Sequence, residues 1–197
     1  MRTSTLAFAI ALALGTTAAV ADQAAKSTDP ATGHSAMAND KTPAPTTATF
    51  VEKAAMGGMT EVELSKLALQ KSKNEEVRNF ANHMVNDHTQ ANEELKSIAT
   101  GKNLQVPADL DAKHKAAIAE LSKKSGAEFD RAYARQMAKD HDKTVALFNA
   151  ASSASAVDPE LQAFARKTLP TLKQHDHLAM QLNSSVDKGT ASTTDDR

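Results

Sequence analysis

The 197-residue chain contains no cysteine and no tryptophan, and only 4% of its residues are aromatic. Without cysteine we expect no disulfide and no lipid anchor on an N-terminal cysteine. Few aromatic residues argue against a β-sheet, which needs β-branched and aromatic side chains, and favour helices packed closely through small residues such as alanine. The formal net charge of -1 gives no electrostatic reason to expect nucleic acid as a partner.

The first 21 residues have the pattern of a secretory signal peptide. Arg2 supplies a positive start, an apolar run follows over residues 6–14, and the small residues Ala19 and Ala21 stand where a signal peptidase cleaves. The apolar run is too short to span a bilayer as a mature helix, and no later stretch is apolar enough to do so. We therefore expect cleavage near Ala21 and an exported, soluble periplasmic protein without a transmembrane segment.

The remaining chain divides by composition into a linker, a domain and a tail. Residues 22–48 consist mainly of Thr, Ala, Pro and Asp with little to bury, which predicts a disordered linker. Residues 187–197 have the same character and predict a disordered tail. The segment between them, residues 49–186, is long enough for one helical domain.

Apolar residues recur at helical spacing throughout that domain. They predict long helices at about 50–72, 75–100, 126–151 and 159–183, and a short helix at about 110–123. An N-cap at Asn74, a capping box at Ser125–Glu128, and Asp158 with Pro159 mark three of the starts, and Pro170 should kink the last helix. The long connection that holds the short helix permits a crossover. We therefore predict an all-α, ferritin-like four-helix bundle with a short extra helix in the crossover.

Polar side chains lie on or beside the apolar face of each long helix, near its middle. At 100° per residue, the Asp-His pair of the second long helix straddles the apolar stripe, and the pair of the third lies within it. Glu61 faces inward while Glu63 faces away, and His175 lies near the middle of its stripe. The inward set is Glu61, Asp87, His88, Asp140, His141 and His175.

These six residues are suitable ligands for a transition metal. Histidine nitrogen and carboxylate oxygen bind iron, manganese, zinc or copper, and an adjacent Asp can instead orient a His as a hydrogen-bond acceptor. On helix lengths alone, His175 lies roughly 9 Å further from its turn than His141, a gap that a longer third helix or the kink would close. The alternative is a structural polar core in which a buried His hydrogen bonds to an Asp or to Tyr133.

Four stretches, "MTEVELSKLAL", "VRNFANHMVNDHTQANEEL", "EFDRAYARQMAKDH" and "LPTLKQHDHL", cover with their spacing nearly all of residues 50–182. In them the chain resembles an exported bacterial family of unknown function whose members are often labelled outer membrane proteins. The resemblance implies a ferritin-like four-helix bundle and no established activity. Ferritin-like di-iron proteins carry Glu-x-x-His, but here Val85, Ala138 and Leu172 stand three residues before the histidines, so oxygen chemistry is not implied.

Two functions therefore stay open. The first is a periplasmic helical bundle that binds a transition metal. The second is a non-catalytic envelope stress or interaction protein with a structural polar core, whose partner is an envelope component or another protein. An enzyme with a nucleophile is not expected, because the chain has no cysteine and no Ser stands with a His and an Asp in a recognisable order. The sequence does not indicate an oligomeric state.

Overall fold

The computed structural model describes residues 43–191, and this part consists of five α-helices without a strand. The helices are α1 (Thr47–Lys71), α2 (Glu75–Gly101), α3 (Ala112–Ser122), α4 (Gly126–Ala151) and α5 (Pro159–Ala191). The all-α prediction is thus confirmed for the described residues. The predicted signal peptide, residues 22–42 of the predicted linker and residues 192–197 of the predicted tail lie outside them. No described helix has the length and apolar character needed to cross a membrane.

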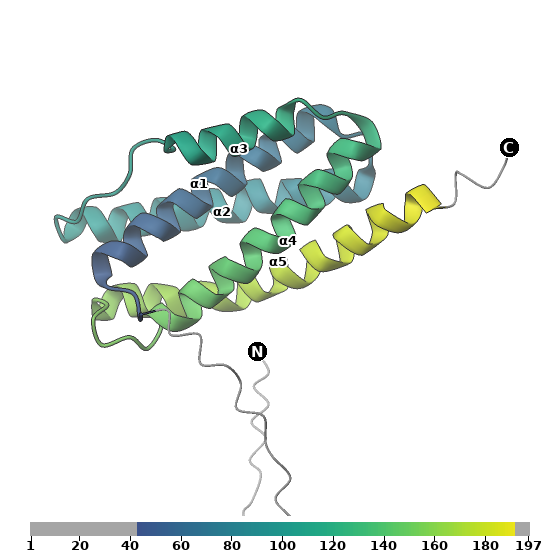
Figure 1. Ribbon diagram of the computed structural model, residues 1–197. Coiled ribbons are helices and arrows are strands. Elements are labelled where there is room, and N and C mark those ends of the chain that lie inside the picture. The colour runs from purple at the N-terminus through teal and green to yellow at the C-terminus, as the bar shows by residue number, and fades with distance from the viewer. Residues whose placement is uncertain (1–42, 192–197) are drawn as a thin grey trace, which may run out of the picture. The chain divides into compact units, whose positions relative to one another are not determined.

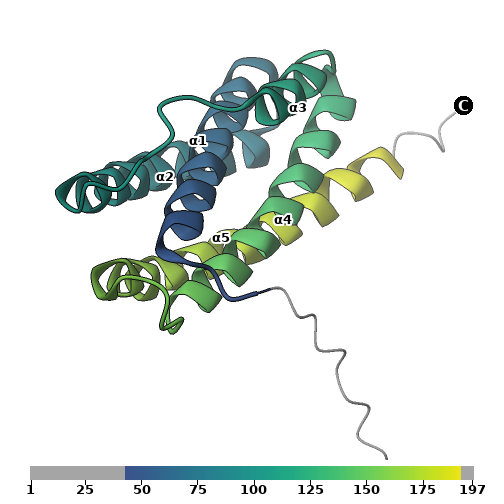
Figure 2. The same ribbon diagram turned by 60° about the vertical axis from the view of Figure 1, so that its left-hand side comes forward.

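The four long helices lie side by side, with α3 along the outside of α1 (Figures 1 and 2). Short connections join α1 to α2 and α4 to α5, and α1 also packs on α4 while α2 packs on α5. The connection from α2 to α4 returns along the molecule through α3. The end of α3 therefore lies near the end of α1, where Lys71 Nζ donates a hydrogen bond to Ser122 O at 2.6 Å. As a result, α4 starts beside the α1–α2 turn.

Local signals set the start of two of the predicted helices. The Asn74 side chain accepts hydrogen bonds from two backbone N–H groups of α2 at 2.8 and 3.3 Å, and Asp158 does the same for α5 at 2.9 and 3.4 Å. The capping box predicted at the start of α4 is wrong. Ser125 makes no side-chain cap hydrogen bond, and Glu128, which would complete the box, pairs with Lys124 instead.

The first helix starts earlier than the sequence suggests, inside the predicted linker. Thr46 caps it by accepting a hydrogen bond from the Thr49 N–H at 3.3 Å. Thr47 donates through its hydroxyl to Ala156 O at 3.1 Å and accepts from the Asp158 N–H at 2.8 Å. The start of α1 is therefore fixed by the distant α4–α5 connection, which its own sequence does not reveal.

The last helix is longer than predicted. It continues to Ala191, past the expected helix end near residue 183 and past the start of the predicted tail. Val186 is buried against α2 and α4 side chains, so packing extends the helix through a polar stretch. Pro170 lies inside α5, which continues through it, and the kink expected there stays a prediction.

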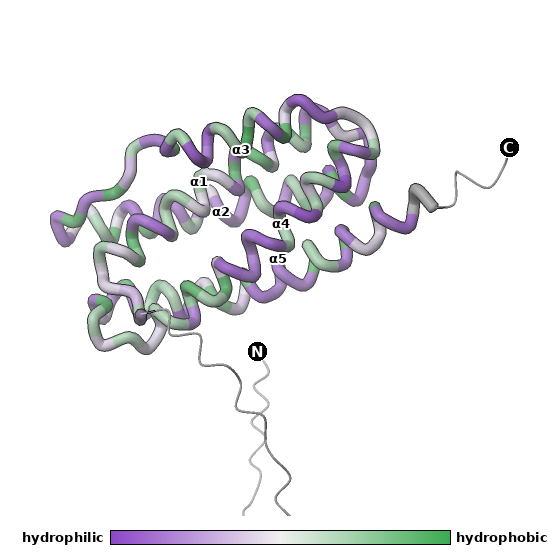
Figure 3. Tube along the Cα trace, in the orientation of Figure 1, coloured by the Kyte–Doolittle hydropathy of each residue, from purple (hydrophilic) through white to green (hydrophobic). Residues whose placement is uncertain are grey.

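The interior consists of two apolar clusters, and hydrophobic and hydrophilic residues alternate along each long helix as amphipathic packing requires (Figure 3). The buried residues of the first apolar cluster are Leu64, Ala68, Val77, Phe80, Ala81, Met84, Leu121, Phe129, Tyr133, Ala134, Met137, Ala179, Leu182 and Val186. Those of the second apolar cluster are Phe50, Val51, Ala54, Ala55, Leu95, Ala99, Phe148, Ala151, Val157, Leu161, Phe164, Ala165 and Leu172. The two clusters occupy different levels along the helices, and the residues between them form the candidate site.

Candidate metal centre

Each long helix places one buried ionisable side chain between the two apolar clusters. Glu61 comes from α1, His88 from α2, His141 from α4 and His175 from α5. Their exposed fractions are 1, 4, 0 and 3%, respectively. On every helix the residues on one side belong to the first apolar cluster and those on the other side to the second. The four side chains therefore form a closed polar layer at mid-length.

Three imidazoles of this layer face one another, and we call His88, His141 and His175 the histidine cluster. Their ring centroids lie 5.3, 5.4 and 5.6 Å apart, and one ring nitrogen from each can be chosen so that all three lie within 4.8 Å. The Nε2 atoms of His88 and His141 are 3.4 Å apart. Two nitrogens bound to one tetrahedral ion at about 2.0–2.1 Å lie about 3.4 Å apart, so these three residues could hold a metal ion.

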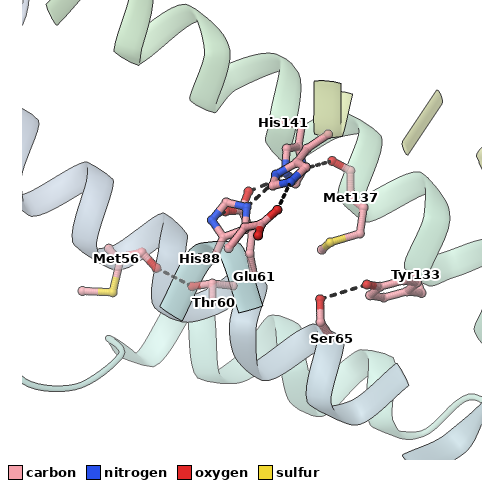
Figure 4. Close-up of polar contacts among 10 residues, drawn as sticks. Met56, Thr60, Glu61, Ser65, His88, Tyr133, Met137 and His141 are labelled. Atoms are coloured by element: carbon pink, nitrogen blue, oxygen red, sulfur yellow. Dashed lines mark hydrogen bonds and ion pairs between the residues drawn. The ribbon is translucent and has the colours of Figure 1, made fainter. Parts of the chain in front are cut away.

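Each imidazole has its other ring nitrogen beside an oxygen atom, as Figure 4 shows for His88 and His141. The pairs are His88 Nδ1 and Glu61 Oε2 at 3.0 Å, His141 Nδ1 and Met137 O at 2.9 Å, and His175 Nε2 and Asp87 Oδ2 at 2.8 Å. Because the Met137 and Asp87 oxygens accept an N–H, they direct the proton of His141 to Nδ1 and that of His175 to Nε2, and leave His141 Nε2 and His175 Nδ1 as lone-pair donors. Both Glu61 oxygens are buried without a hydrogen-bond partner among the described residues, so Glu61 does not fix the proton of His88. His175 Nδ1 is buried without a hydrogen-bond partner among the described residues.

Burial sets the charge of the layer. It lowers the pKa of His88 well below its usual range, lowers that of His141 to about 4, and lowers that of His175. Burial, together with the charge of Asp140, raises the pKa of Glu61 to about 8. At neutral pH the imidazoles are therefore uncharged, the form in which they bind metals, and the Glu61 carboxyl group is protonated.

Two of the six predicted site residues lie at the border of the layer. Asp87 contacts the histidine cluster only through His175, and 43% of its side chain is exposed. Asp140 is directed along its own helix, where it accepts a hydrogen bond from Gln136 Nε2 at 2.6 Å and pairs with Lys143 at 3.2 Å. The structure thus brings four of the six side chains together and places Asp87 beside them.

The histidines of α4 and α5 lie at one level although His175 stands further along its helix. The rings of Phe148 and Phe164 pack 5.8 Å apart, and Arg166 Nη1 donates to Ser152 O at 2.5 Å. The first turns of α5 therefore lie beside the end of α4 and extend beyond it (Figure 2). This overhang, and not a longer α4, closes the gap expected from the helix lengths.

The model of a protein family described as "Domain of unknown function (DUF4142)" matches residues 11–182. The chain belongs to this family. The resemblance to a family of unknown function is thus confirmed. No curated protein matches the chain in sequence.

Two solved structures have a fold similar to that of this DUF4142 chain. The "Crystal structure of DUF305 fragment from Deinococcus radiodurans" has a TM-score of 0.62 and 17% identity, covering 72% of this chain and 97% of that one. "CopM in the Cu(II)-bound form" has a TM-score of 0.59 and 20% identity, with the same coverage of 72% and 97%. At these identities the likeness concerns the fold alone.

The roles of some groups that shape the site of the DUF4142 chain were not predicted from the sequence. The backbone carbonyl of Met137 holds His141, and a main-chain acceptor leaves no signal in residue identity. Tyr133, predicted as a partner for a buried His, forms a 2.9 Å hydrogen bond with Ser65 instead (Figure 4). A small hydroxyl residue on the inward face of α1 was the available signal for that pair. The tyrosine is therefore not a partner of the histidine cluster.

Proposed function

We propose that this protein is an exported, non-enzymatic metal-binding protein that holds one transition-metal ion between His88, His141 and His175. The observation that carries the proposal is the convergence of three buried, uncharged imidazoles, in which the Nε2 atoms of His88 and His141 lie 3.4 Å apart and His175 Nδ1 has no hydrogen-bond partner among the described residues. A purely structural core would pair His175 Nδ1 as well, because a buried polar atom without a partner costs about 1–3 kcal/mol. The unpartnered His175 Nδ1 favours a ligand at this position.

Copper is the first ion to test, followed by zinc. Imidazole nitrogen suits both ions, whereas manganese prefers oxygen ligands. Iron and manganese, also expected from the sequence, fit less well because Asp140 is bound along its own helix and Asp87 is occupied by His175. The fold neighbour CopM is described in a Cu(II)-bound form, which supports this order.

The carboxylates of the site have supporting roles in this proposal. Asp87 holds His175 in orientation, as an outer hydrogen-bond partner of a metal-binding histidine commonly does, and Glu61 Oε2 lies 3.0 Å from His88 Nδ1. Asp140 contributes charge next to the layer without binding the ion. Two hairpins joined by a connection that carries α3 support a ferritin-like four-helix bundle with a crossover as the architecture. The pattern of residues 1–21 supports export to the periplasm.

Metal analysis of the exported protein, purified without an affinity tag, tests the proposal. Because the chain has one candidate three-histidine site, we expect about one copper or zinc ion per chain. His88→Ala, His141→Ala and His175→Ala should each abolish stoichiometric binding in titrations of the metal-free protein. His83→Ala is the matched control, because His83 is exposed on the same helix as His88 and should bind as wild type.

The alternative hypothesis, a structural polar core, predicts a different result for the same variants. If the layer is a structural core of an envelope interaction protein, the native protein carries no stoichiometric metal and takes up none in titration. His141→Ala and His83→Ala then differ in thermal stability and not in metal content. That result would refute the metal-binding proposal.

A further inference from the structure

The histidine cluster has one polar partner that reaches solvent. Of the three groups that hold its rings, Glu61 is 1% exposed and Met137 is 0% exposed. The third, Asp87, has 43% of its side chain exposed and accepts a hydrogen bond from the buried His175 at 2.8 Å. The apolar clusters cover the layer toward both ends of the helices. Of these three groups, Asp87 is therefore the one that joins the histidine cluster to solvent.

The contact between α2 and α5 is polar along its outer edge. Three side-chain pairs cross it in one antiparallel register, and we call them the α2–α5 seam: Glu76 with Ser185, Asp87 with His175, and Glu94 with Lys167. Lys167 Nζ lies 2.8 Å from both Glu94 oxygens, and the Lys167 side chain is 69% exposed. Exposed pairs of this kind contribute little to holding helices together, because water replaces their partners.

The contact between α1 and α4, the other one between long helices without a direct chain connection, is closed by buried groups. Ser65 and Tyr133 form a hydrogen bond there with both residues 0% exposed, and the rings of Phe50 and Phe148 pack 5.1 Å apart. Separating these helices would expose apolar surface, which costs roughly 25 cal/mol per Å². Beside Asp87, between the two apolar clusters, opening the α2–α5 seam exchanges the polar Asp87–His175 contact for water.

We propose that the metal ion reaches the histidine cluster through the α2–α5 seam, and that the Asp87–His175 hydrogen bond holds this route closed. When the bond breaks and the His175 ring rotates outward, solvent and the ion reach the lone pairs of His88 and His141. The inference rests on the proposed function, because it concerns uptake at that site.

The first test compares uptake rates in Asp87→Ala and wild type. Cu(II) is mixed with metal-free protein in a stopped-flow instrument, and its absorption change is followed. Without the charge-assisted hydrogen bond, the association rate constant should rise by about tenfold, although the affinity falls because His175 loses its orienting acceptor. Glu93→Ala is the control, since Glu93 is an exposed carboxylate on the same helix as Asp87, and its rates should equal those of wild type.

A role of Asp87 limited to orienting His175 predicts the opposite kinetics. In that case Asp87→Ala loses affinity through faster dissociation, and its association rate constant stays at or below that of wild type. This outcome would overturn the assignment of the hydrogen bond as the closing contact.

The second test joins the two helices across the seam. Glu94→Cys and Lys167→Cys are introduced together into a chain that has no other cysteine, and the thiols are linked with a short bis-maleimide. Linking should slow Cu(II) association by about tenfold or more through a higher barrier to opening, with unchanged equilibrium affinity. The same double variant with each thiol capped separately is the control and should associate at the wild-type rate.

The outcomes separate this route from the proposed function. Linked protein that binds with normal affinity and at the normal rate would refute the route and leave the site intact. Wild-type protein that binds no Cu(II) or Zn(II) at equilibrium would refute the site and the route together.

Discussion

Glu61→Gln tests the electrostatics of the polar layer in the metal-free protein. The pKa of Glu61 is raised by burial from 4.5 to about 8, so this carboxyl group binds its proton more tightly in the folded chain than in the unfolded one. The resulting stabilisation is present below pH 4.5 and is lost as the pH rises through 8. From about pH 6.5 to 8, at about 1.4 kcal/mol per unit, the wild type should lose about 2 kcal/mol.

The buried histidines determine how the stability of the metal-free protein changes at acid pH. The pKa of His141 is lowered by burial from 6.5 to about 4, so protons favour the unfolded chain and stability is lost as the pH falls from 6.5 toward 4. This residue alone accounts for about 3 kcal/mol, and the pKa values of His88 and His175 shift in the same direction. The metal-free wild type should therefore be most stable at about pH 6.5.

Glutamine has the shape of a protonated glutamate and does not titrate. In Glu61→Gln the alkaline loss should disappear while the acid loss remains. Urea unfolding followed by circular dichroism, with a chelator present, measures both at about pH 5, 6.5 and 8.5. Glu63→Gln is the matched control, since the Glu63 side chain is 49% exposed on the same helix, and it should follow the wild type. Parallel curves for wild type and Glu61→Gln between pH 6.5 and 8.5 would refute the reasoning.

Two further predictions concern packing around the layer. Gly58→Ala should not gain the stability that alanine usually gives a helix, because its Cβ would lie 2.1 Å from Asn92 Oδ1 and displace that side chain, and adding Asn92→Ala should restore the gain of about 0.5–1 kcal/mol. Gly57→Ala, whose nearest atom is 4.0 Å away, should stabilise α1 by about 0.5–1 kcal/mol; an equal loss at both glycines would contradict this. Ser65→Ala strands the Tyr133 hydroxyl and should cost about 1–3 kcal/mol in denaturant unfolding. Adding Tyr133→Phe should recover part of that cost, and strictly additive losses would argue against the pairing.

Helix identity followed from the sequence where the determining signals are local. Asn74 and Asp158 cap helices that begin next to them, so a few neighbouring residues were sufficient. The ends that were missed depend on distant residues. Thr46 caps α1 locally, but Thr47 is also held by the α4–α5 connection, and Val186 is buried against other helices, so both boundaries depend on contacts that are distant in sequence.

For the site, too, the sequence predicted which side chains face inward but not which residues they contact. Helical periodicity predicted that His88, His141 and His175 turn inward, and they meet. Asp87 and Asp140 occupy equivalent places in the two Asp-His pairs but make different contacts. Asp87 bonds to His175 of α5 at 2.8 Å, whereas Asp140 bonds to Gln136, one turn away on its own helix. Which helix lies beside each Asp depends on the topology of the whole chain, and a short sequence motif does not carry that information.

The polar layer also determines where the metal-free molecule is weakest. Helical proteins ordinarily fray from their ends, because terminal residues have the fewest contacts. Here apolar contacts are concentrated on either side of the middle, and the middle contains a protonated carboxyl group and an imidazole nitrogen without a partner. At this level the helix backbones and the histidine layer join the two apolar clusters. An ion bound by histidines of three helices would link α2, α4 and α5 at this level and stabilise the middle of the bundle.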